Sequence, residues 1–414
     1  MKIDLKYGRS ALNFNVADKN LIGIASFSRG PVVSDIEEAF EKAVKNPSGP
    51  GLEDVVRRGD RVLLLTVDFT RPSPQRLIEF LVPRLERMGA KMDIMVGLGN
   101  HRRMTDGEMK GHLGTADAMQ NEADGPFWNL GKTSFGTPVE VDARLKEYDV
   151  RIAVGFVEPS YLLGFTGGRK IIMPGVASPE AIAHNHFMLL TGGRKMGILK
   201  GNPLHEDALQ FAKKVGLHWI VDVVLNPDDG YSAIYCGGME EASSLACRDS
   251  AAIYSYPLSS RADVVVASAG GHPYDFDLVQ TKKSVVPAME YVRDGGVIIL
   301  VGECPDGWGA EGYVSRQALT GQSPGDILSE LYSMFEKKET PWEYAPCSAR
   351  YLFARAYAEK KCRIICVTGI NDELSKTFLD TASSVQEALA MAGETVGRDP
   401  SVFIIPDGRR LIPA

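Results

Sequence analysis

Short, almost wholly apolar segments alternate with amphipathic segments along most of this chain. Apolar runs of this length are typical of strands that are buried on both faces of a parallel sheet. The segments between them repeat apolar residues at the spacing of one helix face. The predicted strands are 62–67, 93–97, 150–156, 220–225, 263–268, 297–302, 362–368 and 402–406. The predicted helices are 35–44, 74–88, 178–189, 206–215, 324–335 and 383–391. This alternation predicts an α/β fold with largely parallel sheets.

The length of the chain, 414 residues, exceeds what one hydrophobic core usually organises. We therefore expect two α/β domains, with the active site in the cleft between them. The composition changes around 254–261, just before a strongly apolar strand, so the boundary is expected there. The predicted first domain is 1–258 plus 400–414, and the second is 259–399. Residues 3–16 alternate apolar and polar side chains and predict a hairpin.

The charge balance argues against nucleic acid or an anionic membrane as a partner. The chain has 46 Lys plus Arg against 53 Asp plus Glu, a formal net charge of −7, with both signs well mixed. No apolar run approaches the roughly 20 residues of a membrane helix, and the first residues do not form a signal peptide. The six cysteines contain no Cys-x-x-Cys pair. They are expected to be buried free thiols of a cytoplasmic protein.

Polar residues follow the first two predicted strands, where an open α/β sheet usually binds its ligand. Asp68, Thr70 and Arg71 come directly after strand 62–67. Arg71 is suited to a carboxylate or phosphate; alternatively, it forms a local ion pair beside a capped helix. His101 follows strand 93–97, where it could carry a proton near neutral pH, or could simply lie on the surface.

The segment from 158 to 186 holds the densest set of candidates. Lys170 follows a Gly-Gly pair and precedes three apolar residues, surroundings in which an amine can lose its proton and become a nucleophile. The spacing matches neither a P-loop nor a dinucleotide motif. His184 and His186 lie two positions apart on a predicted helix, so they cannot hold one metal ion together. Two surface histidines are the alternative.

In the predicted second domain, His272 lies in a glycine-bearing loop after strand 263–268. Gln280 and Lys283 follow at a spacing that puts both on one helix face, where amide and ammonium groups could bind the oxygens of one ligand. A solvated helix face is the alternative.

Taken in order, these motifs resemble the lactate racemase family, whose members use a nickel-pincer nucleotide. The matching features are the N-terminal hairpin, DFTRP at 68–72, GNH at 99–101, EPSY, GFTGGRK and MPG within 158–175, NH at 185–186, the Gln280-x-x-Lys283 pair, and IPDG at 405–408. They span nearly the whole chain, so the resemblance favours a functional role for each loop over its structural alternative.

The resemblance implies how the cofactor, Ni(II)-pyridinium-3,5-bisthiocarboxylate mononucleotide, would be held. Asp68, Thr70 and Arg71 would bind it, and Lys170 would be its covalent tether. His186 would be the protein ligand of nickel, a metal that accepts imidazole nitrogen and favours a square plane. Enzymes that build this cofactor are implied partners.

The resemblance also implies the reaction. The enzyme would be a racemase or epimerase that inverts C2 of a 2-hydroxy acid by reversible hydride transfer to the cofactor. His101 would be a catalytic acid/base. Arg71, Gln280 and Lys283 would bind the substrate, Lys283 as the cationic partner of its carboxylate.

One position departs from the family pattern. A second catalytic histidine follows Glu-Pro in the lactate enzymes, but here that position is Ser160. A serine hydroxyl is not a base near neutral pH unless another group activates it. We therefore expect a substrate larger than lactate, such as a sugar acid. The second proton carrier is expected to be His272, with His184 or a water held by Ser160 as weaker candidates.

Two alternatives stay open. The asymmetric set of bases would also suit a dehydratase or a one-way isomerase with the same cofactor. The chain could also be a non-catalytic homologue that holds or carries the cofactor.

Overall fold

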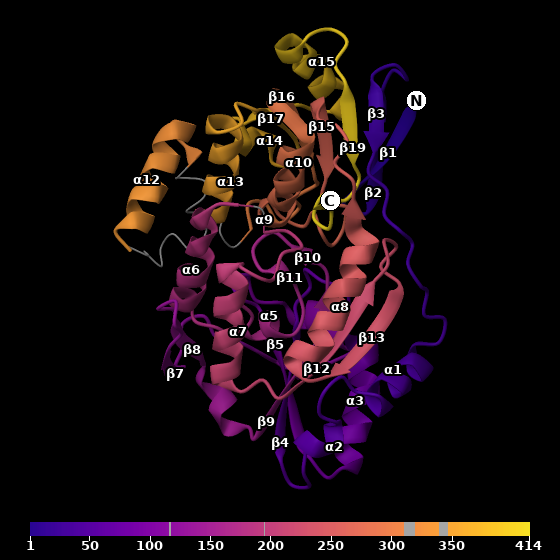
Figure 1. The fold of residues 1–414 in the computed structure, drawn as a ribbon, viewed down its shortest axis with the longest axis vertical. Coiled ribbons are helices and arrows are strands. Elements are labelled where there is room, and N and C mark those ends of the chain that lie inside the picture. The colour runs from indigo at the N-terminus through magenta and orange to yellow at the C-terminus, as the bar shows by residue number, and fades with distance from the viewer. Residues whose placement is uncertain (116, 194, 310–318, 339–346) are drawn as a thin grey trace. The chain divides into compact units, whose positions relative to one another are not determined.

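The computed structural model describes residues 1–115, 117–193, 195–309, 319–338 and 347–414. They form two compact units. The first unit comprises Ser28–Met188 and Gly193–Tyr254. The second unit comprises Met1–Phe27, Leu189–Gly192 and Ser255–Ala414. Figure 1 shows the elements of each unit, coloured along the chain.

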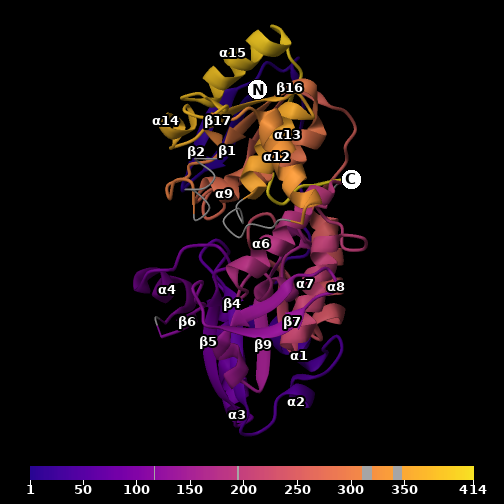
Figure 2. The same ribbon diagram turned by 90° about the vertical axis from the view of Figure 1, so that its left-hand side faces the viewer.

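A six-stranded sheet in the order β13-β12-β9-β4-β5-β6 forms the centre of the first unit. All its neighbouring strands are parallel except β12 and β13, which are antiparallel. Figure 2 shows β9, β4 and β5 together in this sheet. The strands are β4 (Arg61–Val67), β5 (Lys91–Gly97), β6 (Met119–Gln120), β9 (Val150–Val157), β12 (Trp219–Leu225) and β13 (Tyr231–Gly237).

Helices and two small hairpins complete the first unit. One hydrophobic core joins β4, β9 and β12 to the apolar sides of α1 and α3. The helices are α1 (Ile36–Lys45), α2 (Leu52–Val55), α3 (Gln75–Arg87), α4 (Asp106–Leu113), α5 (Arg169–Ile172), α6 (Pro179–Phe187), α7 (Pro203–Val215) and α8 (Met239–Tyr254). The hairpins are β7 (Phe127–Lys132) with β8 (Pro138–Asp142), and β10 (Pro159–Ser160) with β11 (Gly164–Phe165).

A second six-stranded sheet, in the order β18-β17-β16-β15-β19-β3, forms the centre of the second unit, and all its neighbours are parallel. Its strands are β3 (Leu21–Ile24), β15 (Ala262–Ser268), β16 (Val292–Val301), β17 (Arg363–Val367), β18 (Asp380–Thr381) and β19 (Val402–Ile405). The predicted N-terminal hairpin is present as β1 (Lys2–Tyr7) and β2 (Ser10–Asn15). Two short strands, β14 (Ser255–Tyr256) and β20 (Ile412–Pro413), also pair. The described helices are α9 (Leu278–Thr281), α10 (Val285–Tyr291), α12 (Pro324–Glu336), α13 (Cys347–Ala358), α14 (Asn371–Leu374) and α15 (Val385–Val396).

The predicted α/β class and the predicted strands and helices are confirmed, with small shifts at their ends. The helix expected at 206–215 begins earlier, at Pro203, because the Asn202 side chain accepts a hydrogen bond from the Leu204 N–H. The described helices include none that is long and apolar enough to cross a membrane. Five cysteines are buried free thiols: Cys236, Cys247, Cys304, Cys362 and Cys366. The side chain of Cys347 lies outside the described residues.

The structure groups the two ends of the chain differently from the expected domains, which had assigned 1–258 and 400–414 to the first. The break near 254–261 agrees, since the first unit ends at Tyr254. However, β19 pairs with β15 on one side and with β3 on the other, which brings both chain ends into the second unit. The N-terminal hairpin packs its apolar side chains into the same core as β15 and β16. An apolar strand pattern does not reveal which sheet a strand will join.

Candidate active site

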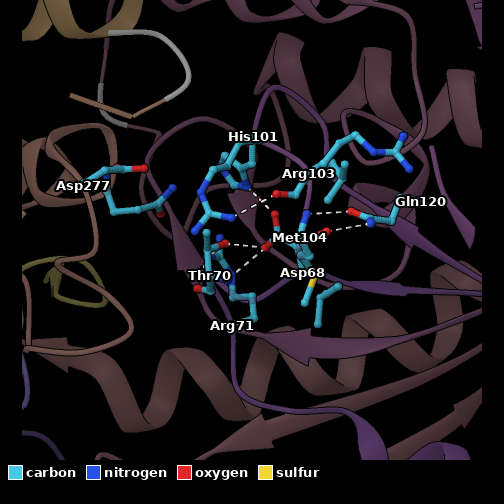
Figure 3. A network of polar contacts seen from close by, with 12 residues as sticks. Asp68, Thr70, Arg71, His101, Arg103, Met104, Gln120 and Asp277 are labelled. Carbon is cyan, nitrogen blue, oxygen red and sulfur yellow. Dashed lines mark hydrogen bonds and ion pairs between the residues drawn. The ribbon is translucent and has the colours of Figure 1, made fainter. Parts of the chain in front are cut away.

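The loop after β4 is folded around the Asp68 carboxylate. Thr70 donates two hydrogen bonds to Asp68 Oδ1, from its backbone N (3.1 Å) and from its hydroxyl (2.6 Å). The Arg71 guanidinium in turn donates to the Thr70 carbonyl oxygen at 2.8 Å and to the Thr70 hydroxyl at 3.1 Å. Figure 3 shows these three side chains together. A carboxylate that accepts local N–H and O–H groups is a typical way to fix such a turn.

His101, from the loop after β5, completes this cluster (Figure 3). Its Nδ1 lies 2.5 Å from Asp68 Oδ2. Strands β4 and β5 are parallel, with Val67 opposite Gly97, so the loops that follow them lie side by side. Gln120 also fixes the loop that contains His101. Its side chain accepts a hydrogen bond from Met104 N at 2.7 Å and donates one to the Met104 carbonyl oxygen at 2.9 Å.

The charge of Asp68 fixes the protonation pattern of this pair. Burial of Asp68 would raise its pKa, but His101, Thr70 and Arg71 act against burial and hold the pKa below the usual range. Asp68 is therefore ionised at neutral pH and can only accept a hydrogen bond, so His101 Nδ1 donates it. A neutral His101 then carries its lone pair on Nε2, the arrangement of a general base.

Glu158 is an acidic partner of Arg71 that the sequence analysis did not assign. It is the first residue after β9 and is fully buried. Its Oε2 lies 3.7 Å from Arg71 Nε. The sequence included Glu158 only as part of a motif. The sequence did contain a signal for this role: Glu158 directly follows a largely apolar strand, and a buried carboxylate needs a hydrogen-bonding or charged partner.

Lys170 lies on the short helix α5, close to the same charges. Burial lowers the pKa of its amine to about 7, aided by the positive charges of Arg71 and Arg169 and opposed by Glu158 and Asp68. No described residue forms a hydrogen bond with the Lys170 amine. Near neutral pH, a large fraction of this amine is therefore neutral, the form in which a lysine can act as a nucleophile.

A buried carboxylate that the sequence analysis did not select, Asp222 on β12, holds the turn before Lys170. Its two oxygens accept hydrogen bonds from Gly168 N (2.9 Å) and from the Ser243 hydroxyl (2.7 Å). Gly167 has a φ of +81°, and a Cβ there would lie 2.8 Å from Asp222 Oδ1. Burial raises the pKa of Asp222 to about 6, although Ser243 and Gly168 act in the opposite direction.

His184 and His186 both lie on α6 and contact different partners. His184 Nδ1 is 2.9 Å from the Thr137 hydroxyl, and His186 Nδ1 is 3.1 Å from Asn185 Oδ1. Ser160 lies on β10, opposite Gly164, and its hydroxyl accepts a hydrogen bond from Leu163 N at 3.4 Å.

The remaining candidates lie in the second unit. Lys283 Nζ donates to Gln280 Oε1, so these two side chains meet as their spacing predicts. His272 is tied to the N-terminal hairpin, since its Nε2 is 2.9 Å from Arg9 Nη2. A guanidinium only donates, so His272 Nε2 is the acceptor. Partial burial, and then the charge of Arg9, lower the pKa of His272.

Two family models cover most of the chain. The lactate racemase N-terminal domain matches residues 7–197, and the lactate racemase C-terminal domain matches residues 258–412. The chain belongs to the lactate racemase family. It is therefore an isomerase, and the resemblance expected from its motifs is confirmed.

Individual relatives align over nearly their whole length. The lactate racemase of Thermoanaerobacterium thermosaccharolyticum is 30% identical over 99% of this chain and 98% of its own. The lactate racemase of Lactiplantibacillus plantarum is 27% identical over 99% of each chain. The apoprotein structure of the former enzyme matches with a TM-score of 0.88 and 28% identity, over 100% of both chains. A Thermotoga maritima protein, 19% identical over 93% of this chain and 99% of its own, shares the fold with a TM-score of 0.70.

Proposed function

We propose that this enzyme inverts C2 of a 2-hydroxy acid larger than lactate, with a nickel-pincer nucleotide as its cofactor. The observation that carries the proposal is the state of Lys170. Its amine has a pKa of about 7 and interacts electrostatically with the charges of Asp68, Arg71 and Glu158. Membership of the lactate racemase family adds to this chemistry.

The side chains of the first unit suit the proposed cofactor. Lys170 would form the covalent tether, while Asp68, Thr70 and Arg71 would hold the nucleotide. His186 would be the protein ligand of nickel. Within the described residues, no group of three or more His, Cys, Asp and Glu side chains is placed to hold a metal ion. A pincer cofactor would supply the further ligands of a metal bound through His186.

When bound, this cofactor would supply a reversible acceptor for the hydride of C2. The chain would supply the proton chemistry: His101 Nε2 takes the proton of the C2 hydroxyl, and ionised Asp68 stabilises the imidazolium that forms. Arg71, Gln280 and Lys283 would bind the substrate, with Lys283 as the cationic partner of its carboxylate.

The substrate class is inferred from Ser160. Its hydroxyl accepts the Leu163 N–H, and a serine side chain is much smaller than an imidazole, so we infer that the exchange makes room for a longer substrate. We propose a sugar acid or another polyhydroxy acid. His272 is the proposed second proton carrier, because it lies in the loop after β15 that leads to Gln280 and Lys283. His184 and a water held by Ser160 are weaker candidates.

The serine at position 160 also favours a second candidate function. If only His101 moves a proton, the two faces of the substrate are treated unequally, as in a dehydratase or a one-way isomerase. The Gln280–Lys283 pair argues against a third possibility, a protein that only holds or carries the cofactor, because such a protein would not need a substrate-binding pair.

The test begins with protein produced together with the enzymes that build the cofactor. Intact mass and nickel analysis should reveal one adduct and one nickel per chain in the wild type and neither in Lys170→Arg. Proton NMR in deuterated water then follows a panel of hydroxy acids. Inversion at C2 without loss of water supports the proposal, and loss of water supports the dehydratase. Wild-type protein with no adduct and no nickel would reject the cofactor assignment.

A further inference from the structure

The amide of Asn185, the residue before His186, has a fixed orientation. Asn185 is fully buried on α6. Its Nδ2 donates to the Leu204 carbonyl oxygen at 3.1 Å and to Asp207 Oδ2 at 2.7 Å. Both partners can only accept, so both amide hydrogens are used and the oxygen must be the atom on the other side.

This orientation determines the tautomer of His186. Asn185 Oδ1 faces His186 Nδ1 at 3.1 Å. An amide oxygen only accepts, so Nδ1 is the nitrogen that carries the hydrogen. A neutral imidazole protonated at Nδ1 has its lone pair on Nε2.

Asp207, the anchor of this arrangement, is fully buried on α7 and surrounded by donors. Its Oδ1 accepts the Thr133 hydroxyl at 2.5 Å, and its Oδ2 accepts the Thr137 hydroxyl at 2.9 Å in addition to Asn185. Because Thr137 gives its hydrogen to Asp207, its oxygen accepts from His184 Nδ1 at 2.9 Å. Both helix histidines are thus oriented, by separate routes, from one carboxylate.

We propose that Asn185, anchored by Asp207, is a positioning residue that holds His186 as the Nδ1–H tautomer and presents Nε2 to the metal of the cofactor. A metal-bound histidine usually donates its second nitrogen to a carbonyl or carboxylate, which sets the ring orientation. The tautomer follows from contacts within the chain, whereas its use in metal binding rests on the proposed function.

The tautomer is measurable in cofactor-free, full-length protein labelled with nitrogen-15 at histidine. Two-bond nitrogen–hydrogen correlation spectra distinguish Nδ1–H from Nε2–H rings, and His184→Gln and His186→Gln assign the two signals. We expect both rings to be Nδ1–H in the wild type. A wild-type His186 protonated at Nε2 would overturn the inference without any need for a variant at Asn185.

The variant Asn185→Leu tests the cause. We expect His186 to lose its Nδ1–H preference, while His184 keeps its own because its route through Thr137 is intact. The matched control is Thr133→Val, which removes a donor to Asp207 but leaves Asn185 in place, so His186 should keep the wild-type tautomer. An unchanged His186 in folded Asn185→Leu would overturn the positioning role.

Nickel retention in loaded protein separates this inference from the proposed function. After dialysis against a chelator, Asn185→Leu should hold nickel about 10- to 100-fold more weakly than the wild type. If His186→Ala loses nickel while Asn185→Leu retains it fully, the positioning role is wrong. If His186→Ala also retains nickel fully, the assignment of His186 as the metal ligand is wrong. The separate result that would reject the proposed function is wild-type protein with no adduct on Lys170 and no nickel.

Discussion

Asp68 Oδ2 and His101 Nδ1 lie 2.5 Å apart, although 33 residues separate them in the chain. The pair forms because β4 and β5 are parallel neighbours whose ends lie in register. Since the pKa of Asp68 stays low despite its burial, the carboxylate remains an acceptor and keeps the lone pair of His101 on Nε2. This contact gives His101 the orientation and tautomer that a general base requires.

Replacing Asp68 with Asn should reverse that tautomer. The new amide can donate to His101 Nδ1, which would place the hydrogen on Nε2 and prevent His101 from accepting a proton from the C2 hydroxyl. We expect kcat per nickel-loaded chain to fall by about 10²- to 10⁴-fold. Rates of C2 inversion, normalised to nickel content, provide the measurement.

Asp93→Asn is the matched control for this change. Asp93 lies on β5 and accepts a hydrogen bond from the Tyr148 hydroxyl at 2.8 Å, away from His101. Its replacement should leave kcat at the wild-type value. Equal rates for Asp68→Asn and Asp93→Asn would contradict the role given to Asp68.

The reactivity of Lys170 should titrate near neutral pH. Burial and the nearby Arg71 and Arg169 charges lower the pKa of its amine to about 7, against roughly 10.4 for an ordinary lysine. In cofactor-free protein, labelling of Lys170 by a small acylating reagent, measured by peptide mass spectrometry, should reach half its maximum near pH 7. Exposed lysines in the same sample supply the internal reference.

The variant Arg71→Met tests the cause of that shift. It removes a positive charge that disfavours the ammonium form, so the labelling midpoint of Lys170 should move to higher pH. An unchanged midpoint in Arg71→Met would show that Arg71 does not act on Lys170. A wild-type midpoint near that of the exposed lysines would reject the activated amine altogether.

Much of the fold, and the polar loops that form the first unit's part of the site, follow from local patterns in the sequence. The buried strands and the polar loops after them were predictable because apolar runs and strand ends are local features. That Asp68, Arg71, His101 and Lys170 share one cluster follows from parallel strands ending on one edge. The partner of Arg71 did not follow, because Glu158 lies 87 positions further along the chain and only the tertiary fold brings it close.

Two other groups were missed although the sequence held a signal for one of them. Asp222 interrupts a strand that is otherwise apolar, and a carboxylate in a buried strand must find donors. Asp207 gave no such signal, because an acidic residue on a helix of mixed pattern usually faces water. The assignment of both chain ends to the second unit depended on strand pairing, which no local pattern encodes.

The substitution Ser160→His should change substrate preference. An imidazole would restore a second base and fill the space that we assign to a longer substrate. The ratio of kcat/KM for lactate to that for a sugar acid should therefore rise, measured on loaded enzyme. Ser160→Ala keeps the space open and adds no base, so its ratio should stay near that of the wild type. A ratio in Ser160→His no higher than in Ser160→Ala would reject Ser160 as the determinant of substrate size.

Asp222 should make the stability of the protein fall as the pH rises from about 4 to about 6. Its pKa is about 6 in the folded protein, against about 3.9 in an unfolded chain, so the folded state binds the proton more tightly over this range. Stability falls with rising pH wherever the folded state binds more protons, and two pKa units correspond to on the order of 3 kcal/mol. Asp222→Asn cannot ionise, so its free energy of unfolding, measured with urea, should gain about that amount relative to the wild type between pH 4 and pH 7.

The variant Ser243→Ala should act in the opposite direction on the same titration. It removes the hydroxyl that favours the ionised form of Asp222, so the pKa of Asp222 should rise further. The fall in the free energy of unfolding should then extend to higher pH than in the wild type. If the difference between Asp222→Asn and the wild type were independent of pH, Asp222 would be ionised like a surface carboxylate. The hydrogen bond from Gly168 N to Asp222, which holds the turn before Lys170, would then be made to a charged carboxylate at every pH tested.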